Sequence, residues 1–353
     1  MPLILHGATA ILQICRPPLP FPAQYGKLAS MVRVGVDENV ADELLAEFPS
    51  QAQIVRLGRT VPEPIDVDFW ILPFYRKDAQ NAFPHLRGLK IAQSLMAGVD
   101  WILPWLPKGV TLCDGRGIHD ISASEWVMAA ILSAMKRIPL YRDLQSQQRW
   151  KGFATVTDSF LGEAGAARGQ YTILAEDLAG KNVLIVGYGS IGAAIEARLA
   201  PFGVTVQRVA RTPRQIPLVH PVSELGQRLP AADIVVLIVP LTAETRGMFG
   251  EAQFQQMKPG ALLVNAARGP VVDTEALVRA LNAGKIRAAL DVTDPEPLPE
   301  GHPLWTAPNC LITPHIGGST PEFIYRAFRF AARQVARFAA GQPLENVVTD
   351  AGY

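Results

Sequence analysis

The sequence is poor in cysteine, in net charge and in long apolar runs, and each shortage excludes a class of protein. Among 353 residues there are three cysteines, Cys15, Cys113 and Cys310, an odd number with no two close together. This pattern argues against a disulfide framework and against a structural zinc site. We therefore expect three small apolar thiols in a reducing cytoplasm, and no bound metal.

Charge and hydropathy exclude two further classes. The formal net charge is +1, from 33 Lys and Arg against 32 Asp and Glu, with no basic arm or patch, so nucleic acid is not an expected partner. The longest apolar candidate, Ile234–Val239, ends at Pro240. It is far shorter than the roughly 18 residues that a membrane-spanning helix needs, so no membrane partner is expected either.

What the sequence does contain is enough apolar material for two globular domains. Hydrophobic residues make up 49% of the chain and charged residues 18%. The first thirty residues stand apart, because a proline cluster from Pro17 to Pro22 follows an interrupted apolar stretch. They make a poor secretory signal. We expect residues 1–30 to be a mobile extension, or a segment that precedes a natural start at Met31.

Strand-like apolar runs alternate with amphipathic stretches from Met31 onward, which predicts βαβ units and mostly parallel sheets. In the first half the expected strands are Val32–Val36, Gln53–Leu57, Phe69–Pro73, Ile91–Leu95 and Val110–Cys113. In the second half they are Asn182–Val186, Val204–Val209, Ile234–Val239, Leu262–Ala266, Ile286–Asp291 and Leu311–Thr313. The fold class is thus α/β.

Two segments lie between these halves. A long helix is expected from about Ser124 to Gln145, with Ser122 and Glu125 spaced for a capping box at its start. Between Trp150 and Tyr171 a Gly/Ala-rich stretch has no clear period, and we interpret it as a mobile surface excursion between domains.

Polar and glycine residues follow the strands of the second half directly. In an open α/β sheet the carboxyl ends of the strands form the edge where ligands bind. So many such residues at one edge of a sheet are not expected by chance, and they predict a ligand-binding site there. Its members are Gly187, Arg211, Pro240, Thr242, Arg268, Asp291 and His315.

The segment NVLIVGYGSIGAAIEARLAPFG predicts a dinucleotide site. Gly187 permits a tight turn, Gly189 lets the backbone approach a pyrophosphate, and Gly192 lets the helix pack close to the strand. The amides at Ser190, Ile191 and Gly192 then meet the phosphate charge. A lone motif of this kind is often a glycine-rich turn, but here a strand precedes it and a helix follows.

The second strand of this unit favours NADP over NAD. An NAD enzyme normally carries an Asp or Glu about 20 residues after the glycines to hold the ribose hydroxyls. No acidic residue occurs between Glu196 and Glu224, and Ala210 stands where the acid is expected. Arg211, Thr212 and Arg214 follow, and arginine forks suit a 2′-phosphate. Ordinary loop arginines are the alternative, so NAD stays open.

Three residues at successive strand ends carry potential for acid–base chemistry. His315 can exchange a proton near neutral pH, and Arg268 can hold a carboxylate or polarise a carbonyl. A carboxylate at Glu296 would favour the protonated form of His315 and fix its tautomer. Each residue alone is most often structural or solvated. Their occurrence together, downstream of the dinucleotide motif, predicts an active site.

The segments GYGSIG, VNAARGPVVDTEALVRALNAGKI, ALDVTDPEPLPEGHPLW and LITPHIGGST resemble the D-2-hydroxyacid dehydrogenase family. The resemblance runs from about Met31 to the end and is strongest from Leu178 to Thr320. It implies two Rossmann-like or flavodoxin-like doubly wound parallel-sheet domains with a cleft between them. It assigns Arg268, Glu296 and His315 as catalytic residues.

The resemblance also implies how the chain is divided. Residues 31–123 with 317–353, whose last helix returns to the first domain, would bind the substrate, and residues 124–316 the dinucleotide. Backbone amides in SLMAGVD, at Met96, Ala97, Gly98 and Val99, would hold the substrate carboxylate. Further cofactor contacts are expected at Pro240, Thr245, Ala266, Asp291 and Gly317. The family also implies a homodimer.

The expected reaction is hydride transfer between NAD(P) and a small D-2-hydroxy acid or 2-keto acid. Glyoxylate, hydroxypyruvate and larger keto acids stay open as substrates. One alternative is a non-enzymatic dinucleotide sensor of the corepressor type, which keeps the same three residues. The other is a formate or phosphite dehydrogenase on the same scaffold, although the apolar Leu95 and Met96 disfavour it.

Overall fold

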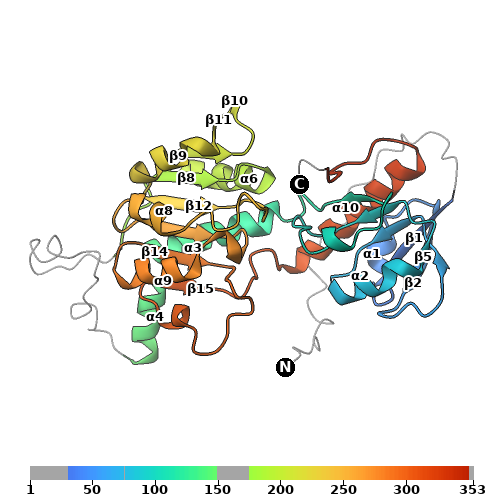
Figure 1. Ribbon diagram of the computed structural model, residues 1–353, viewed down its shortest axis with the longest axis horizontal. Coiled ribbons are helices and arrows are strands. Elements are labelled where there is room, and N and C mark those ends of the chain that lie inside the picture. Colours follow the sequence, from blue (N-terminus) through green and yellow to red (C-terminus); the bar gives the residue numbers. More distant parts are fainter. Residues whose placement is uncertain (1–30, 75, 149–174, 350–353) are drawn as a thin grey trace, which may run out of the picture.

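The computed structural model describes residues 31–74, 76–148 and 175–349, which fold into two lobes (Figure 1). Each lobe is built on its own parallel sheet, and the chain passes between them at the start of α3 (Asp120–Met135) and before α10 (Pro321–Ala339). The predicted α/β class is confirmed. The predictions for residues 1–30 and for the stretch between Trp150 and Tyr171 lie outside the described residues.

The smaller lobe contains a five-stranded parallel sheet in the order β2-β1-β4-β6-β7. A short parallel pair, β3 and β5, lies beside it, and α1 and α2 complete the N-terminal part. The elements are β1 Val32–Asp37, α1 Asp42–Leu45, β2 Ala52–Leu57, β3 Ile65–Asp66, β4 Phe69–Ile71, α2 Arg76–Ala82, β5 Leu86–Arg87, β6 Ile91–Gln93 and β7 Thr111–Cys113.

The C-terminal helix α10 belongs to this lobe by packing. Figure 1 shows it beside β1 although it comes near the end of the chain. Its apolar side, including Phe328, Ala331 and Val335, packs with Val34 and Phe69 in one buried cluster. A last helix within residues 317–353 is therefore present as expected, and it packs against the first sheet.

The larger lobe contains an eight-stranded sheet in the order β10-β11-β9-β8-β12-β13-β14-β15. All its pairs are parallel except β10 with β11, which is antiparallel. Its strands are β8 Asn182–Val186, β9 Thr205–Ala210, β10 Arg214–Gln215, β11 Leu218–Pro221, β12 Ile234–Leu237, β13 Leu262–Asn265, β14 Arg287–Leu290 and β15 Cys310–Ile312. Its helices are α4 Ile138–Ser146, α6 Ser190–Leu199, α7 Leu225–Arg228, α8 Glu251–Gln256 and α9 Thr274–Asn282, together with α3.

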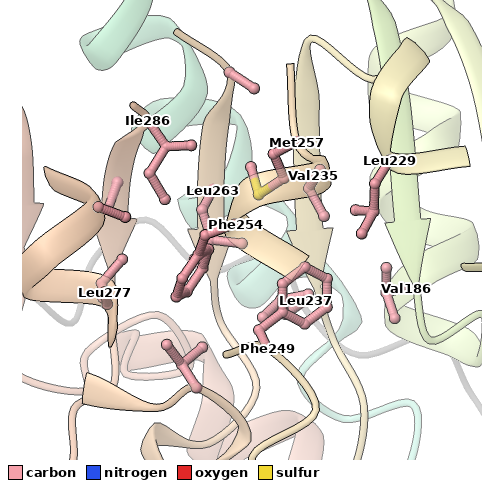
Figure 2. Close-up of a cluster of buried hydrophobic side chains, with 14 of the residues drawn as sticks. Val186, Leu229, Val235, Leu237, Phe249, Phe254, Met257, Leu263, Leu277 and Ile286 are labelled. Atoms are coloured by element: carbon pink, nitrogen blue, oxygen red, sulfur yellow. The ribbon is translucent and has the colours of Figure 1, made fainter. Parts of the chain in front are cut away.

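Both faces of the large sheet are buried, because helices cover each of them. Successive residues of a strand point to opposite faces. On one face Val183 and Ile185 pack with residues of α3 and α6. On the other, Val235, Leu237 and Leu263 meet Phe249 and the residues of α8 and α9 (Figure 2). This two-sided burial fixes the positions of the loops that leave the carboxyl ends of the strands.

The predicted strands are confirmed to within two residues at every end, but the long helix is not. It begins at Asp120 with no side-chain cap, so the capping box at Ser122 and Glu125 is wrong. It also stops at Met135, because Arg137 adopts a left-handed conformation with φ of 55°, and α4 starts with Pro139 near its beginning. Pro139 has no N–H to donate to the Met135 carbonyl oxygen, and its ring would clash with that carbonyl in a continuous helix, which explains the break.

Across the described residues, no helix combines the length and the apolar character needed to cross a membrane. In the same part of the chain no group of three His, Cys, Asp or Glu side chains is placed to hold a metal ion. Burial raises the pKa of the Cys113 thiol to about 12 and that of Cys310 to about 12, so both stay protonated. Cys15 lies outside the described residues.

Candidate active site

A cavity of about 150 Å³ lies where the strand order of the large sheet reverses, between β8 and β12. This is the position at which open α/β sheets bind ligands. Its lining comes from both lobes, with the loop after β6 on one side and the loops after β8, β12 and β13 on the other. It consists of Ala97, Gly98, Arg116, Gly189, Ser190, Ile191, Gly192, Ile238, Val239, Pro240, Ala266, Ala267 and Arg268.

The three glycines of the dinucleotide motif have the spatial constraints that the sequence predicts. Gly187 has φ of 100°, and a Cβ there would lie 2.5 Å from the Ile238 carbonyl oxygen. A Cβ on Gly192 would lie 2.6 Å from the Gly187 oxygen, so only glycine lets α6 approach β8. Around Gly189 the space is open to 4 Å. A phosphate can therefore reach the N-terminus of α6, and the residues fit a dinucleotide.

The end of β9 is Ala210, so no acidic side chain stands at the predicted ribose position. Arg211 and Thr212 are exposed just beyond it. Arg214 lies over the Tyr188 ring at 5.3 Å and donates to the Tyr188 carbonyl oxygen. Tyr188, between the first two glycines, therefore holds this predicted 2′-phosphate ligand against the glycine loop, a contact that sequence reasoning missed.

Among the other predicted cofactor residues, Thr245 contributes mainly to loop structure, whereas Pro240 and Ala266 line the cavity. Thr245 Oγ1 donates to the Pro240 carbonyl oxygen at 2.6 Å and accepts the Thr242 amide at 2.8 Å. These bonds shape the turn after β12, which brings Pro240 to the cavity. Ala266, after β13, lines the same cavity.

Arg268, which follows β13, reaches residues 94–100 of the other lobe. This segment, in which the substrate-binding amides are expected, is called the substrate loop below. A methyl group built on Gly98 would lie 1.7 Å from Nη2 of Arg268. Nη1 donates to the Ala267 carbonyl oxygen at 2.8 Å, and Nε lies 3.4 Å from the Asp100 carboxylate. Asp100 was not among the predicted residues, although it is the last residue of the predicted loop SLMAGVD.

His315 and Glu296 form a close pair. The distance from His315 Nδ1 to Glu296 Oε1 is 2.6 Å, and both side chains are about 40% exposed. The hydrogen bond from His315 holds the pKa of Glu296 below its ordinary value, and the charge of Arg268 acts in the same direction. With Nδ1 engaged, Nε2 is the ring atom left for proton exchange. The structure thus pairs His315 with Glu296 and places Arg268 near enough for its charge to act on Glu296.

Asp291 holds the loop that carries His315. Its carboxylate, with the residue 4% exposed, accepts from Thr313 Oγ1 at 2.6 Å and from the amides of Ile316 and Gly317 at 2.9 and 2.7 Å. The His315 amide donates to the Asp291 carbonyl oxygen at 2.7 Å. Asp291 and Gly317, predicted as cofactor contacts, therefore have a clear structural part in placing the histidine.

The substrate loop offers three of its four predicted amides. The Met96 amide already donates to Ser94 Oγ at 3.0 Å. Within the described residues no acceptor is found for the amides of Ala97, Gly98 and Val99. The Val99 side chain is buried, so this residue can act only through its backbone. Adjacent free amides are the groups that hold carboxylates in proteins.

His119 is a buried histidine that the sequence did not single out. It precedes α3, stacks on Phe323 at 4.5 Å, and would lie 2.8 Å from a Cβ on Gly318. Among the described residues its ring nitrogens have no hydrogen-bond partner, and burial lowers the pKa of His119 to about 4. It is therefore neutral at neutral pH and fills the junction where the chain crosses between the lobes.

Comparison with known proteins identifies relatives of this arrangement. Residues 128–317 match the family model of the NAD binding domain of D-isomer specific 2-hydroxyacid dehydrogenases. The chain is similar to the D-3-phosphoglycerate dehydrogenase of Methanocaldococcus jannaschii, with 32% identity over 339 residues. The match covers 90% of this chain but only 59% of that protein. It is also 34% identical over 277 residues to the glyoxylate reductase of Thermofilum pendens, covering 75% of each chain.

Solved structures show the same fold. The NADPH-dependent glyoxylate/hydroxypyruvate reductase of Sinorhizobium meliloti, in complex with NADP and sulfate, superimposes with a TM-score of 0.74 at 26% identity. The match covers 91% of this chain and 99% of that one.

Proposed function

Because the chain belongs to the D-isomer specific 2-hydroxyacid dehydrogenase family, we propose that it reduces a small 2-keto acid to the 2-hydroxy acid, or the reverse, with a nicotinamide dinucleotide. The observation that carries this proposal is the His315–Glu296 pair beside Arg268, next to a glycine loop that fits a dinucleotide. Residues 124–316 would bind the cofactor, and residues 31–123 with 317–353 the acid.

When bound at the glycine loop, a nicotinamide dinucleotide would supply the hydride that reduces the carbonyl group. Arg268 and the amides of Ala97 to Val99 bind the substrate carboxylate, and Arg268 also stabilises the charge that develops on the carbonyl oxygen. His315 donates a proton from Nε2 to that oxygen, which yields the hydroxyl group. Glu296 fixes the ring through Nδ1 and stabilises its charged form.

NADP is the favoured cofactor in this proposal. Two observations support it: the absence of an acid at Ala210 and the placement of Arg214 on Tyr188 beside the glycine loop. The Sinorhizobium meliloti relative is itself described as NADPH-dependent. A homodimer, which rests on the family alone, and a location in the cytoplasm, which rests on the few unpaired cysteines, complete the proposal.

The test is the rate of NADPH oxidation, with NADH in parallel, against glyoxylate, hydroxypyruvate, pyruvate and a branched 2-keto acid. Turnover with NADPH well above that with NADH supports the reaction class and the arginine interpretation. Preference for NADH keeps the dehydrogenase and refutes that interpretation. Tight binding of either cofactor without turnover of any acid favours the dinucleotide sensor instead.

A further inference from the structure

The cleft contains a second guanidinium that the proposed reaction does not use. Arg116 follows β7 in the small lobe and lines the same cavity as Gly98 and Arg268. Within the described residues this cavity is lined by two arginines and by no acidic side chain. An anionic ligand is therefore favoured along its whole length.

Arg116 is held in place from behind by a buried carboxylate. The side chain of Asp114 is 1% exposed and accepts from the Arg116 amide and from Nη2, both at 2.8 Å. A buried carboxylate is costly unless it is paired, so Asp114 fixes the position of the arginine. The Arg116 carbonyl oxygen also accepts from Asn346 Nδ2 at 2.8 Å, which anchors the segment to the C-terminal part of the chain.

The segment that carries Arg116 also contacts the substrate loop through its neighbour Gly115. The Gly115 amide donates to the Met96 carbonyl oxygen at 2.8 Å, and a Cβ on Gly115 would lie 2.7 Å from the backbone of Leu95. Arg116 is consequently tied to the loop whose amides are proposed to hold the substrate carboxylate.

Most of the hydrogen-bonding capacity of the Arg116 guanidinium is not used by this anchor. A guanidinium has five N–H donors in a planar fork, and in the described residues only Nη2 has an acceptor, Asp114. The side chain is 45% exposed. Such a fork matches the two oxygens of a carboxylate or a phosphate.

The other anions of the reaction already have binding groups. The 2-keto-acid carboxylate has Arg268 and the loop amides, and the cofactor pyrophosphate has the N-terminus of α6. We propose that Arg116 determines specificity by binding a second anionic group, a carboxylate or a phosphate, at the far end of the substrate. This inference rests on the proposed function, and it narrows the substrate class to 2-keto acids with two negatively charged groups.

The experiment compares kcat/KM for substrate pairs that differ only in the distal anion. One pair is 2-oxoglutarate with 2-oxopentanoate, and the other is phosphohydroxypyruvate with hydroxypyruvate. Wild-type protein should prefer the charged member of at least one pair by tenfold or more, about 1.4 kcal/mol. The pair that shows the preference identifies the distal anion as carboxylate or phosphate.

Arg116→Gln should abolish that preference and leave kcat/KM for the neutral member within about threefold of wild type. Arg116→Lys, which keeps the charge but loses the fork, should retain part of it. Arg87→Gln is the matched control, because Arg87 is an exposed arginine of the same lobe that does not line the cavity, and it should change nothing.

Three outcomes overturn the inference. Wild-type protein without preference for a charged member has no distal anion site. Equal losses for both members of a pair in Arg116→Gln, or a raised KM for NADPH alone, assign Arg116 to the cofactor instead. Absence of turnover with all four acids, together with the panel above, refutes the proposed function itself.

Discussion

His315 occupies a backbone conformation that its neighbours must maintain. Its φ of 55° lies in the left-handed region, which is unfavourable for a residue with a side chain and persists only where surrounding contacts fix it. Asp291 supplies those contacts through its carbonyl and carboxylate oxygens. The histidine is thereby positioned before any substrate arrives, and only its protonation depends on the partner at Nδ1.

Glu296 gives His315 both a hydrogen bond at Nδ1 and a negative charge, and Glu296→Gln should remove the charge while keeping a hydrogen-bond acceptor. His315 lowers the pKa of Glu296, so the carboxylate is present above its ordinary pKa and is lost only as the pH falls through the lowered value. Glutamine still accepts from Nδ1 but leaves the charged imidazole without a counter-charge. We expect kcat/KM for keto-acid reduction to fall about ten- to a hundredfold at pH 7.5.

The pH profile of kcat/KM is the measurement that tests this expectation. In Glu296→Gln the alkaline limb of the reduction profile should move to lower pH, because the charged ring is less well stabilised. Glu300→Gln, an exposed acid a few residues along, is the control and should leave the profile in place. An unchanged limb in Glu296→Gln would mean that the carboxylate only orients the ring.

For single residues, the sequence predicts which site residues directly follow the strands of the large sheet. The carboxyl ends of parallel strands lie at one edge, independent of the conformation of the loops. Arg268, Glu296 and His315 are found in this way. Asp114 and Arg116 also follow a strand, β7, but their segment is anchored in addition by Asn346, a contact across 230 residues. No local pattern encodes such a contact, and the tie between Arg268 and Asp100 is missed for the same reason.

At the scale of elements, apolar runs and prolines predict the strands and helices within a βαβ unit. They fail where contacts with a distant segment determine the secondary structure. The strands of both sheets follow from apolar runs. The end of α3 could have been predicted from Pro139, which follows Arg137 closely and outweighs the helical periodicity. The short β10–β11 pair has no such signal, because Leu218–Pro221 gains its strand character by pairing with β9.

Helix α10 is attached to the small lobe through a buried amide network besides its apolar side. The Gln334 side chain, fully buried, donates to Gln93 Oε1 at 3.0 Å and to the Glu345 carbonyl oxygen at 2.8 Å, and accepts the Glu345 amide at 3.0 Å. These bonds link α10 to β6 and to the segment after the helix. Buried polar groups of this kind are costly when they lose their partners.

Gln334→Met should therefore lower the free energy of unfolding by about 2–4 kcal/mol, because it removes the partner of Gln93 Oε1 and of both Glu345 backbone groups. The size of the side chain is nearly kept, so packing changes little. Chemical denaturation followed by circular dichroism measures the change. Gln342→Met, the same substitution at an exposed position, is the control and should stay within about 0.5 kcal/mol of wild type. Equal effects of the two variants would show that the amide network contributes nothing.

At the scale of the whole molecule, the two lobes form one site only while Arg268 lies against the substrate loop. Arg268 belongs to the large lobe, and Gly98 and Asp100 to the small one. The cavity is lined by residues of both. Catalysis by positioning is sensitive to shifts of about 1 Å, so the absence of a side chain at Gly98 is a condition for the site and not only for the loop.

Gly98→Ala tests this relation between the lobes. The new methyl group would lie 1.7 Å from Nη2 of Arg268, and the flexible guanidinium, not the backbone, would have to move. We expect the melting temperature and the Kd for NADPH to stay near the wild-type values, while kcat/KM for the acid falls roughly tenfold to a hundredfold. Gly250→Ala is the control, since a methyl group there meets nothing closer than 3.9 Å. If Gly98→Ala kept full activity, Arg268 could serve the substrate from a position away from the loop, and the proposed sharing of the carboxylate between Arg268 and the loop amides would be wrong.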